Sequence, residues 1–304
     1  MDKLNENIFH QYNKWKKGYE RKENSFIMRL NNFLSNQKRN DVYYHISEDG
    51  KHVDCDESVR IKDEDLIDGK FPFPFGKVKG NFRCSGCENL TSLEGAPEEV
   101  SGDFSSSSCP KLTSLEGAPK KVGGDFMSRS CSNLTSLVGM PEDVYGSFYC
   151  NECPKLTSLK GAPKKVGETF ACYGCDLLTS LEGAPKKVDA HFYTHNCPNL
   201  TSLEGAPEKV TGSFGCYGCD SLTSLEGAPK KVGVHFSCKE CTKLTSLEGA
   251  PKEVGRDFIC YNCPKLTSLE YLPKKINGIL KVDGRFEGQI SSDILAKKYN
   301  ITYE

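Results

Sequence analysis

Residues 144–166 read VYGSFYCNECPKLTSLKGAPKKV, and this pattern returns along most of the chain with a period of 22 residues. A phenylalanine holds the same place in each unit, at positions 82, 104, 126, 148, 170, 192, 214, 236 and 258. Units of this length cannot bury an apolar face alone, so stacking has to supply the core. About nine such units predict one solenoid rather than two globular domains.

Each unit carries the features of a short strand followed by a turn. Val144, Phe148 and Cys150 alternate with period two, which predicts one strand with these side chains inside. The second cysteine, Cys153, is expected to help satisfy backbone groups within the coil. The two leucines of Leu-Thr-Ser-Leu are expected to fill the core, and the Gly-Ala-Pro segment turns the chain round.

The period lies within the range of about 20–29 residues that leucine-rich repeats use. The predicted fold is therefore an α/β repeat solenoid, a leucine-rich-repeat horseshoe with a parallel β-sheet on its concave side. We expect an N-terminal helical cap over residues 1–40 and a strand-rich lead-in cap over 41–75. The solenoid is expected to span 76–281, and a C-terminal cap, with a helix over 293–299, spans 282–304. Alternatively, the N-terminal helices recruit a partner.

Composition favours a protein that works in a reducing compartment. The 304 residues carry a formal net charge of −1, so no overall field favours nucleic acid or acidic membranes. The polar start MDKLNENIF does not fit an export signal, and no apolar run approaches the ~18 residues of a membrane span. Without an export signal, sixteen cysteines indicate free thiols, so we expect a cytoplasmic location.

Paired cysteines suggest a metal site. Cys150, Cys153, Cys172 and Cys175 have the C-x2-C-x18-C-x2-C spacing of zinc sites. The gap of 18 residues, however, is what the period leaves between two four-residue motifs. Serine or threonine replaces the first cysteine in three units, whereas the second is always cysteine. Such a slot favours a small buried side chain, so we expect a packing ladder and no metal or other cofactor.

Paired lysines after the repeat proline suggest a phosphate-binding stripe. Glutamates recur four residues earlier in the unit, and acidic pairs interrupt the lysines at 98–99 and 142–143. Neighbouring rows of opposite charge are typical of a solvated surface. We therefore do not expect a nucleic-acid partner.

The residues that flank each buried phenylalanine vary from unit to unit and are expected to point outward on the concave side. From the fourth unit on, these positions gather side chains typical of binding hot spots. The predicted binding surface comprises Tyr145, Tyr149, Tyr173, His191, Tyr193, His195, Tyr217, His235, Lys239 and Tyr261. Small residues at 171 and 215 are expected to leave depressions beside Tyr193. Exposed strand positions also favour tyrosine without any ligand.

Catalysis is not expected on this surface. His191 and His195 lie four residues apart on one strand, about 13 Å, and His191 and His235 lie two strands apart, about 9.6 Å. Neither pair can share a metal ion, because zinc–nitrogen bonds are only about 2.0–2.1 Å long. The sequence has no Ser-His-Asp elbow, P-loop or glycine-rich dinucleotide turn.

The string LTSLEGAPKKVGGDF at 112–126 resembles leucine-rich-repeat proteins of large tailed bacteriophages. The lead-in HVDCDESVRIKDEDLIDGKFPFPFGKVKGNFRC at 52–84 is similar to theirs as well. The Leu-Thr-Ser-Leu stretch also resembles the recognition domains of secreted bacterial ubiquitin-ligase effectors, but no segment outside the repeats is long enough for their catalytic domain. The phage resemblance implies an infected bacterial cytoplasm and a host or phage target.

Together these observations predict a non-enzymatic binding protein that engages a host protein through its concave face, for host takeover or against host defence. One alternative is a protein that sequesters a small molecule, with the Tyr, His and Lys rows stacking a base and pairing a phosphate. Another is a structural accessory of the virion. A protein partner is the leading expectation, and membrane association is not expected.

Overall fold

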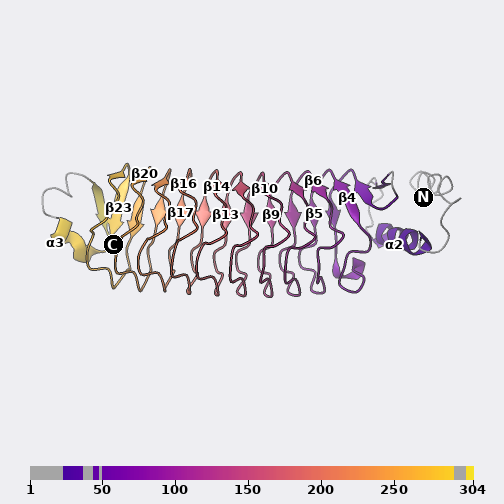
Figure 1. The fold of residues 1–304 in the computed structure, drawn as a ribbon, viewed down its shortest axis with the longest axis horizontal. Coiled ribbons are helices and arrows are strands. Elements are labelled where there is room, and N and C mark those ends of the chain that lie inside the picture. Colours follow the sequence, from indigo (N-terminus) through magenta and orange to yellow (C-terminus); the bar gives the residue numbers. More distant parts are fainter. Residues whose placement is uncertain (1–22, 37–43, 48–49, 291–298) are drawn as a thin grey trace.

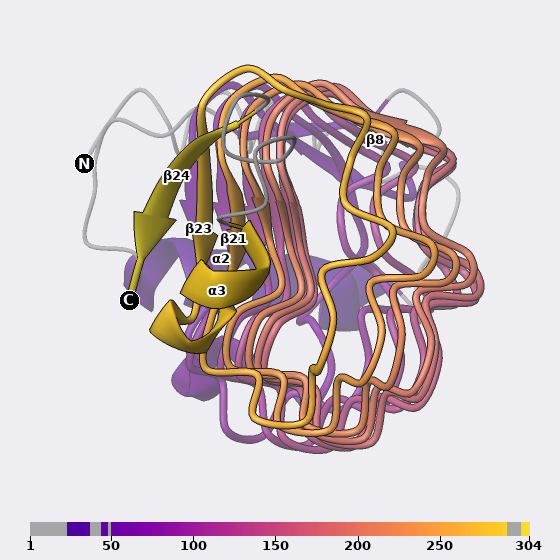
Figure 2. The same cartoon turned by 90° about the vertical axis from the view of Figure 1, so that its left-hand side faces the viewer.

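The computed structural model describes residues 23–36, 44–47, 50–290 and 299–304. In this part of the chain the 22-residue units stack in a straight row, with one turn of chain per unit (Figure 1). Viewed from the end of the row, successive turns almost superimpose around one continuous core (Figure 2). The chain is a parallel β-solenoid, as the period predicts.

One side of the solenoid is a twelve-stranded parallel sheet, here called the long sheet. Each strand pairs with the strand one period away, so Phe148 lies opposite Phe126 and Phe170. Its strands are β3 (Val59–Arg60), β5 (Phe82–Arg83), β7 (Phe104–Ser105), β9 (Phe126–Met127), β11 (Phe148–Tyr149), β13 (Phe170–Ala171), β15 (Phe192–Tyr193), β17 (Phe214–Gly215), β19 (Phe236–Ser237), β21 (Phe258–Cys260), β23 (Ile279–Val282) and β24 (Asn300–Tyr303).

A second side of each turn carries a further short strand. These strands form a five-stranded and a seven-stranded sheet. The five strands are β1 (Tyr44–Ile46), β2 (Val53–Cys55), β4 (Phe75–Val78), β6 (Glu99–Val100) and β8 (Lys121–Val122). The seven are β10 (Asp143–Val144), β12 (Lys165–Val166), β14 (Lys187–Val188), β16 (Lys209–Val210), β18 (Lys231–Val232), β20 (Glu253–Val254) and β22 (Lys275–Ile276).

The repeat valine and phenylalanine lie on two strands, not on one. Val144 ends β10, and Phe148 begins β11 in the long sheet. The chain turns a corner between them, and the corner packs against the corner below. A Cβ on Gly123 would lie 2.2 Å from the Ser101 carbonyl oxygen, so a side chain at this position would require the corner to shift. The prediction of a single strand was wrong, although both side chains point into the core as expected.

The expected horseshoe is not seen, because the row of turns is straight (Figure 1). Curvature arises when one side of each turn is wider than the other, as a helix is wider than a strand. Here the turns carry paired strands on two sides, and strands stack at the same spacing of about 4.8 Å wherever they lie. The outward side of the long sheet, here called the long-sheet face, is therefore not concave along its length.

The core consists of columns of identical side chains. The repeat phenylalanines from Phe82 to Phe258 are 0–1% exposed, with neighbouring ring centroids 4.8–5.8 Å apart. Both leucines of each Leu-Thr-Ser-Leu segment are buried too. Gly161 turns the chain after the leucines with a φ of 93°, a value that favours glycine. The assignment of these residues to core and turn is confirmed.

Both cysteine slots are buried, and all sixteen thiols are free. The invariant second cysteine donates its S–H to a carbonyl oxygen of the preceding turn. Cys109 Sγ lies 3.2 Å from the Cys84 oxygen, and Cys175 Sγ lies 3.4 Å from the Cys150 oxygen. The expected role of this cysteine, satisfying backbone groups inside the coil, is confirmed. The first slot needs only a small side chain, so Ser106 and Ser128 pair there through their hydroxyls at 2.7 Å.

Helical caps are not supported at either end. At the N-terminal end one helix, α2 (Glu23–Asn36), packs Phe33 against the rings of Phe73 and Phe75, with centroids 5.4 and 6.0 Å away. The helix expected before it lies outside the described residues. The first turns also contain the β1–β2 hairpin, whose second strand pairs with β4, and a 3-10 helix, η1 (Asp63–Asp65). Strand pairing thus continues to this end of the solenoid.

The C-terminal end is closed by a strand. The chain passes through η2 (Gly284–Phe286) and the four-residue α3 (Glu287–Ile290), and then β24 pairs in parallel with β23. The helix expected over 293–299 falls mostly on 291–298, outside the described residues. Tyr299 is buried and donates from its hydroxyl to the Pro273 oxygen at 2.6 Å. The sheet continues because β23 offers an unpaired edge, which β24 covers.

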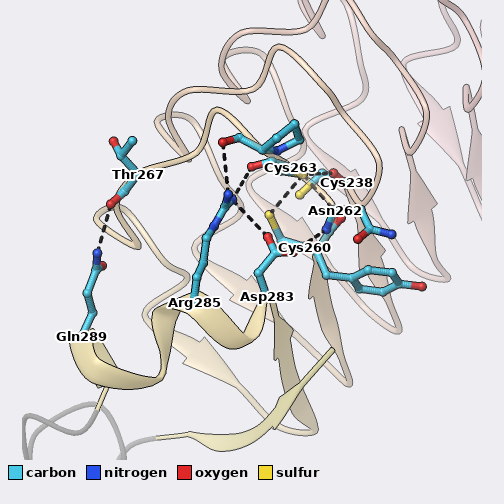
Figure 3. Close-up of polar contacts among 10 residues, drawn as sticks. Cys238, Cys260, Asn262, Cys263, Thr267, Asp283, Arg285 and Gln289 are labelled. Carbon is cyan, nitrogen blue, oxygen red and sulfur yellow. Dashed lines mark hydrogen bonds and ion pairs between the residues drawn. The ribbon is translucent and has the colours of Figure 1, made fainter.

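Side chains of this last segment replace the bonds that a further repeat would make (Figure 3). Inside the solenoid, the Glu240 N–H donates to the Tyr261 carbonyl one turn on. In the next unit, the Asn262 N–H donates instead to the Asp283 carboxylate, at 2.9 Å. Arg285 donates to the carbonyl oxygens of Pro264 and Cys263 and pairs with Asp283 at 3.1 Å. These side chains therefore satisfy the Asn262 N–H and the Pro264 and Cys263 oxygens where no further repeat follows.

Candidate binding surface on the long sheet

Three rows of side chains run along the long-sheet face, parallel to the solenoid axis. We name them by their position in the unit. The pre-Phe row holds the residue before each phenylalanine, the post-Phe row the residue after it, and the third row the residue three places after it. In the fourth unit these residues are Ser147, Tyr149 and Asn151.

The third row contains a continuous stack of flat rings. His195 lies between Tyr173 and Tyr217, with ring centroids 4.3 and 4.2 Å away and planes within 9° of parallel. The spacing follows from the fold, because residues one period apart lie on neighbouring strands about 4.8 Å apart. The Lys239 ammonium continues the stack, 5.1 Å from the Tyr217 centroid and 5.6 Å from that of Tyr261. The structure thus brings five predicted site residues into one row.

Its position between two tyrosines keeps His195 neutral. Burial lowers the pKa of this imidazole from 6.5 to about 4. Nδ1 is buried and has no hydrogen-bond partner among the described residues. His195 therefore adds a polar but uncharged ring to the face over the physiological pH range.

The pre-Phe row works mainly as a hydrogen-bond ladder. Asp125 Oδ1 accepts from the Ser147 N–H at 2.7 Å, and His191 Nδ1 accepts from the Ser213 N–H at 3.0 Å. His235 lies in the same row, with Nδ1 3.0 Å from the Asp257 carboxylate. Both predicted histidines thus belong to contacts between turns, a function that sequence reasoning missed. Asn, Asp, Ser and His side chains can all accept a hydrogen bond. A row that varies among them therefore indicates side chains that accept from a backbone N–H of the next turn.

The post-Phe row holds Tyr149 and Tyr193, both half-buried. The expected depression at Gly215 is absent, because the Tyr193 ring covers that residue. A Cβ on Gly215 would lie 3.2 Å from Tyr193 Cδ1, and Gly215 is buried. The absence of a side chain at 215 allows the tyrosine to lie flat on the sheet. The prediction of a hollow there was wrong because it ignored the side chain next to it.

Tyr145 does not join the other predicted residues. It follows β10, at the corner between the two sides of the turn, and 68% of it is exposed. The remaining nine predicted residues occupy the three rows of the long-sheet face.

The third row also contains two residues that were not predicted. The guanidinium of Arg129 lies 3.8 Å from the centroid of the Tyr149 ring. Asn151, the next residue of the row, is 1% exposed, and its Oδ1 has no hydrogen-bond partner among the described residues. The sequence could have indicated these two residues only through their position, since both fall in the row that holds the aromatic stack.

On the other side of the solenoid, acidic residues neutralise the lysine pairs. Lys120 and Lys121 pair with Glu98 and Glu99, at 3.1 and 2.7 Å. Lys164 pairs with Glu142 at 2.6 Å. The acidic residues that interrupt the lysine rows provide these partners, rather than the glutamates four residues earlier in the unit. The self-compensating surface is confirmed, with different pairs.

The thiols of both cysteine slots are buried, and those of the second slot donate to carbonyl oxygens. Burial raises the pKa of Cys153 to about 12 and that of Cys150 well above its usual value. In the described part of the chain, we find no group of three or more His, Cys, Asp or Glu side chains placed to hold a metal ion. The helices within that same part are also too short or too polar to cross a bilayer.

The repeat, the parallel pairing with a 22-residue register and the buried leucine columns define a leucine-rich-repeat-like β-solenoid. Neither a protein-family model nor a curated protein sequence matches the chain. Among solved structures, a leucine-rich repeat protein from Bacteroides ovatus ATCC 8483 is similar, with 14% identity and a TM-score of 0.26. The match covers 88% of this chain and 99% of that one. At this score the likeness adds nothing to a class that the chain's own geometry defines.

Proposed function

We propose that this chain is a non-enzymatic binding protein that engages a protein partner through the long-sheet face. One observation carries the proposal. Over five consecutive units, the third row presents Tyr173, His195, Tyr217, Lys239 and Tyr261 as one ordered strip. The strip is about 19 Å long, since it spans four strand spacings of about 4.8 Å. Rigid aromatic side chains lose little conformational entropy on binding, which suits a contact surface.

The same stacking favours a protein over a nucleotide. A base that stacks on tyrosine needs a free ring face. The inner faces of Tyr173 and Tyr217 already lie against His195, and the next face of Tyr217 lies against Lys239. The rings therefore offer mainly their edges and polar tips. Edges and hydroxyl groups suit the mixed apolar and polar surface of a protein.

The setting that we propose comes from the resemblance to phage repeat proteins. It is the cytoplasm of an infected bacterium, where the partner would be a host protein and the effect host takeover or protection from a defence protein.

Retention of partners from bacterial lysate tests the proposal. The tagged chain is incubated with lysate, and all retained proteins and small molecules are identified by mass spectrometry. We expect one host protein that the parent retains and the Tyr173→Ala, Tyr193→Ala, Tyr217→Ala variant loses.

The matched control removes exposed tyrosines away from the long-sheet rows, in a Tyr145→Ala, Tyr271→Ala variant. These side chains are 68% and 52% exposed. The control should retain the same host protein. Equal retention by the triple variant, or retention of a nucleotide alone, would contradict binding of a protein through this face.

A further inference from the structure

Several cations on the long-sheet face are paired with carboxylates. Three of those in its rows have an acidic partner within ion-pair distance. These pairs are Arg83 with Asp103, Lys239 with Glu240, and Lys281 with Glu304. Arg129 differs from these three. Among the described residues, no carboxylate lies within ion-pair distance of its guanidinium.

The unpaired guanidinium is ordered rather than free in solvent. Arg129 is half-buried, and its guanidinium lies 3.8 Å above the Tyr149 ring. Stacking on a ring favours one orientation of the planar group, and little entropy remains to be lost when a ligand binds. Its Nε is buried and donates to no acceptor among the described residues. A half-buried cation with an unused donor is costly unless an anion completes it.

Asn151 provides a second, independent observation at the same place. It is the next residue of the third row, one strand spacing or about 4.8 Å along the axis from Arg129. Only 1% of it is exposed, yet Oδ1 accepts no hydrogen bond in the described part of the chain. Among the described residues, the Arg129 Nε–H thus has no acceptor and Asn151 Oδ1 has no donor. An acidic residue within a polypeptide has both, a side-chain carboxylate and backbone N–H groups.

We propose that Arg129, Tyr149 and Asn151 form the anchoring subsite for an Asp or Glu side chain of the protein partner. This proposal rests on the proposed function and names the chemistry of the partner. The guanidinium donates two parallel N–H bonds to the carboxylate from its two Nη atoms, and the Asn151 side chain turns outward so that its Oδ1 accepts an N–H of the partner. Tyr149 holds the guanidinium in plane. Tyr173, the next residue of the row, connects the subsite to the aromatic strip.

The first test uses the full chain labelled with nitrogen-15 and follows the Nε–Hε resonance of Arg129 by NMR. The probe is the blocked tripeptide N-acetyl-glycyl-glutamyl-glycinamide, with its glutamine counterpart as the uncharged control. We expect a saturable shift with the glutamyl peptide, little shift with the glutaminyl peptide, and no response at Arg83. Equal responses to both peptides, or none to either, would overturn the subsite.

Titration with inorganic phosphate distinguishes a site for a carboxylate from a site for a phosphoryl group. If phosphate shifts the Arg129 resonance at lower concentration than the glutamyl peptide does, the site takes a phosphoryl group and the assignment to a carboxylate is wrong. Arg129→Lys keeps the charge but lacks the planar fork. We expect Arg129→Lys to bind the glutamyl peptide more weakly, followed through the resonances of residues around Asn151. Unchanged binding by this variant would count against bidentate recognition.

The second test uses the host protein that the parent chain retains. Arg129→Gln should weaken its affinity about tenfold or more, as expected for the loss of a charge-assisted hydrogen bond. The matched control is Arg83→Gln, which removes a cation that already has a partner. If the tyrosine variant loses the partner but Arg129→Gln binds it with parental affinity, the subsite is wrong while the proposed function stands.

Discussion

One side-chain contact recurs in every unit: the thiol of the second cysteine slot donates to a carbonyl oxygen one turn below. The contact recurs from Cys87 to Cys263, with sulfur–oxygen distances of 3.2–3.5 Å. A thiol is a weak donor, but it fits a slot too small for a longer polar side chain. This cysteine contributes through its packing and through this weak hydrogen bond.

This burial predicts that the thiols are unreactive in the folded protein. Only a thiolate reacts rapidly, and burial raises the pKa of Cys87 and Cys109 to about 12. We expect iodoacetamide to modify none of the sixteen cysteines of the native protein at neutral pH, and all sixteen in denaturant. Intact-mass spectrometry after a short exposure checks this. Rapid labelling of even two cysteines in the native protein would show that part of the solenoid core opens to solvent.

His195 predicts a pH dependence of stability. Its folded-state pKa is about 4, whereas the unfolded chain titrates near 6.5. The unfolded chain binds this proton first, so the contribution to stability is complete above pH 6.5 and is lost as the pH falls toward 4. The variant His195→Phe keeps a flat ring in the stack but removes the titration. The Tm of the parent should fall more than that of the variant between pH 7 and pH 4. Parallel curves would contradict a neutral His195.

At the scale of the element, two-residue strands are too short to be stable alone, and the rows between turns hold them together. The pre-Phe row shows this clearly. Asn81, Asp103 and Asp125 each accept the N–H of the next residue in the row, at 2.7, 3.0 and 2.7 Å. Each side chain thus fixes the start of the neighbouring strand in the long sheet.

Removal of one acceptor from this row should destabilise the solenoid. Asp125→Ala leaves the N–H of Ser147 without its acceptor, and Ser147 is only 3% exposed. We expect a loss of about 1–3 kcal/mol of unfolding free energy, measured by urea denaturation. Thr169 lies in the same row but accepts no such bond within the described part of the chain, so Thr169→Ala should cost about 0.5 kcal/mol or less. Equal losses for the two variants would show that the ladder has no special role.

The whole molecule is a linear array, in which each turn contacts its two neighbours and the ends need special closure. Figure 1 shows this row, with α2 at one end and α3 at the other. Stability in such an array is the sum of the turns and the contacts between them. The face that carries the binding rows is therefore as long and as rigid as the stack.

The array predicts that a whole turn can be removed more safely than half a turn. Deletion of residues 101–122 joins Val100 to Gly123 and preserves the pattern of the unit as well as the rows from Arg129 to Tyr261. We expect a folded protein with a lower urea m-value, in line with one turn fewer. Deletion of residues 101–111 removes fewer residues but breaks the period, and it should abolish cooperative unfolding. Circular dichroism during urea denaturation distinguishes the two, and equal loss of structure would contradict modular stacking.

The sequence by itself determined the period, the buried columns of side chains and the glycine turns. It also determined the role of the second cysteine in satisfying backbone groups, and the nine outward residues of the long-sheet face. These follow from local chemistry repeated every 22 residues, so one unit describes all. The tertiary structure alone decided what depends on neighbouring turns. It divided Val144 and Phe148 between two sheets, kept the stack straight and turned Tyr193 over Gly215. Among the described residues it also left Arg129 without an acidic partner, because only stacking decides which side chains meet across a strand spacing.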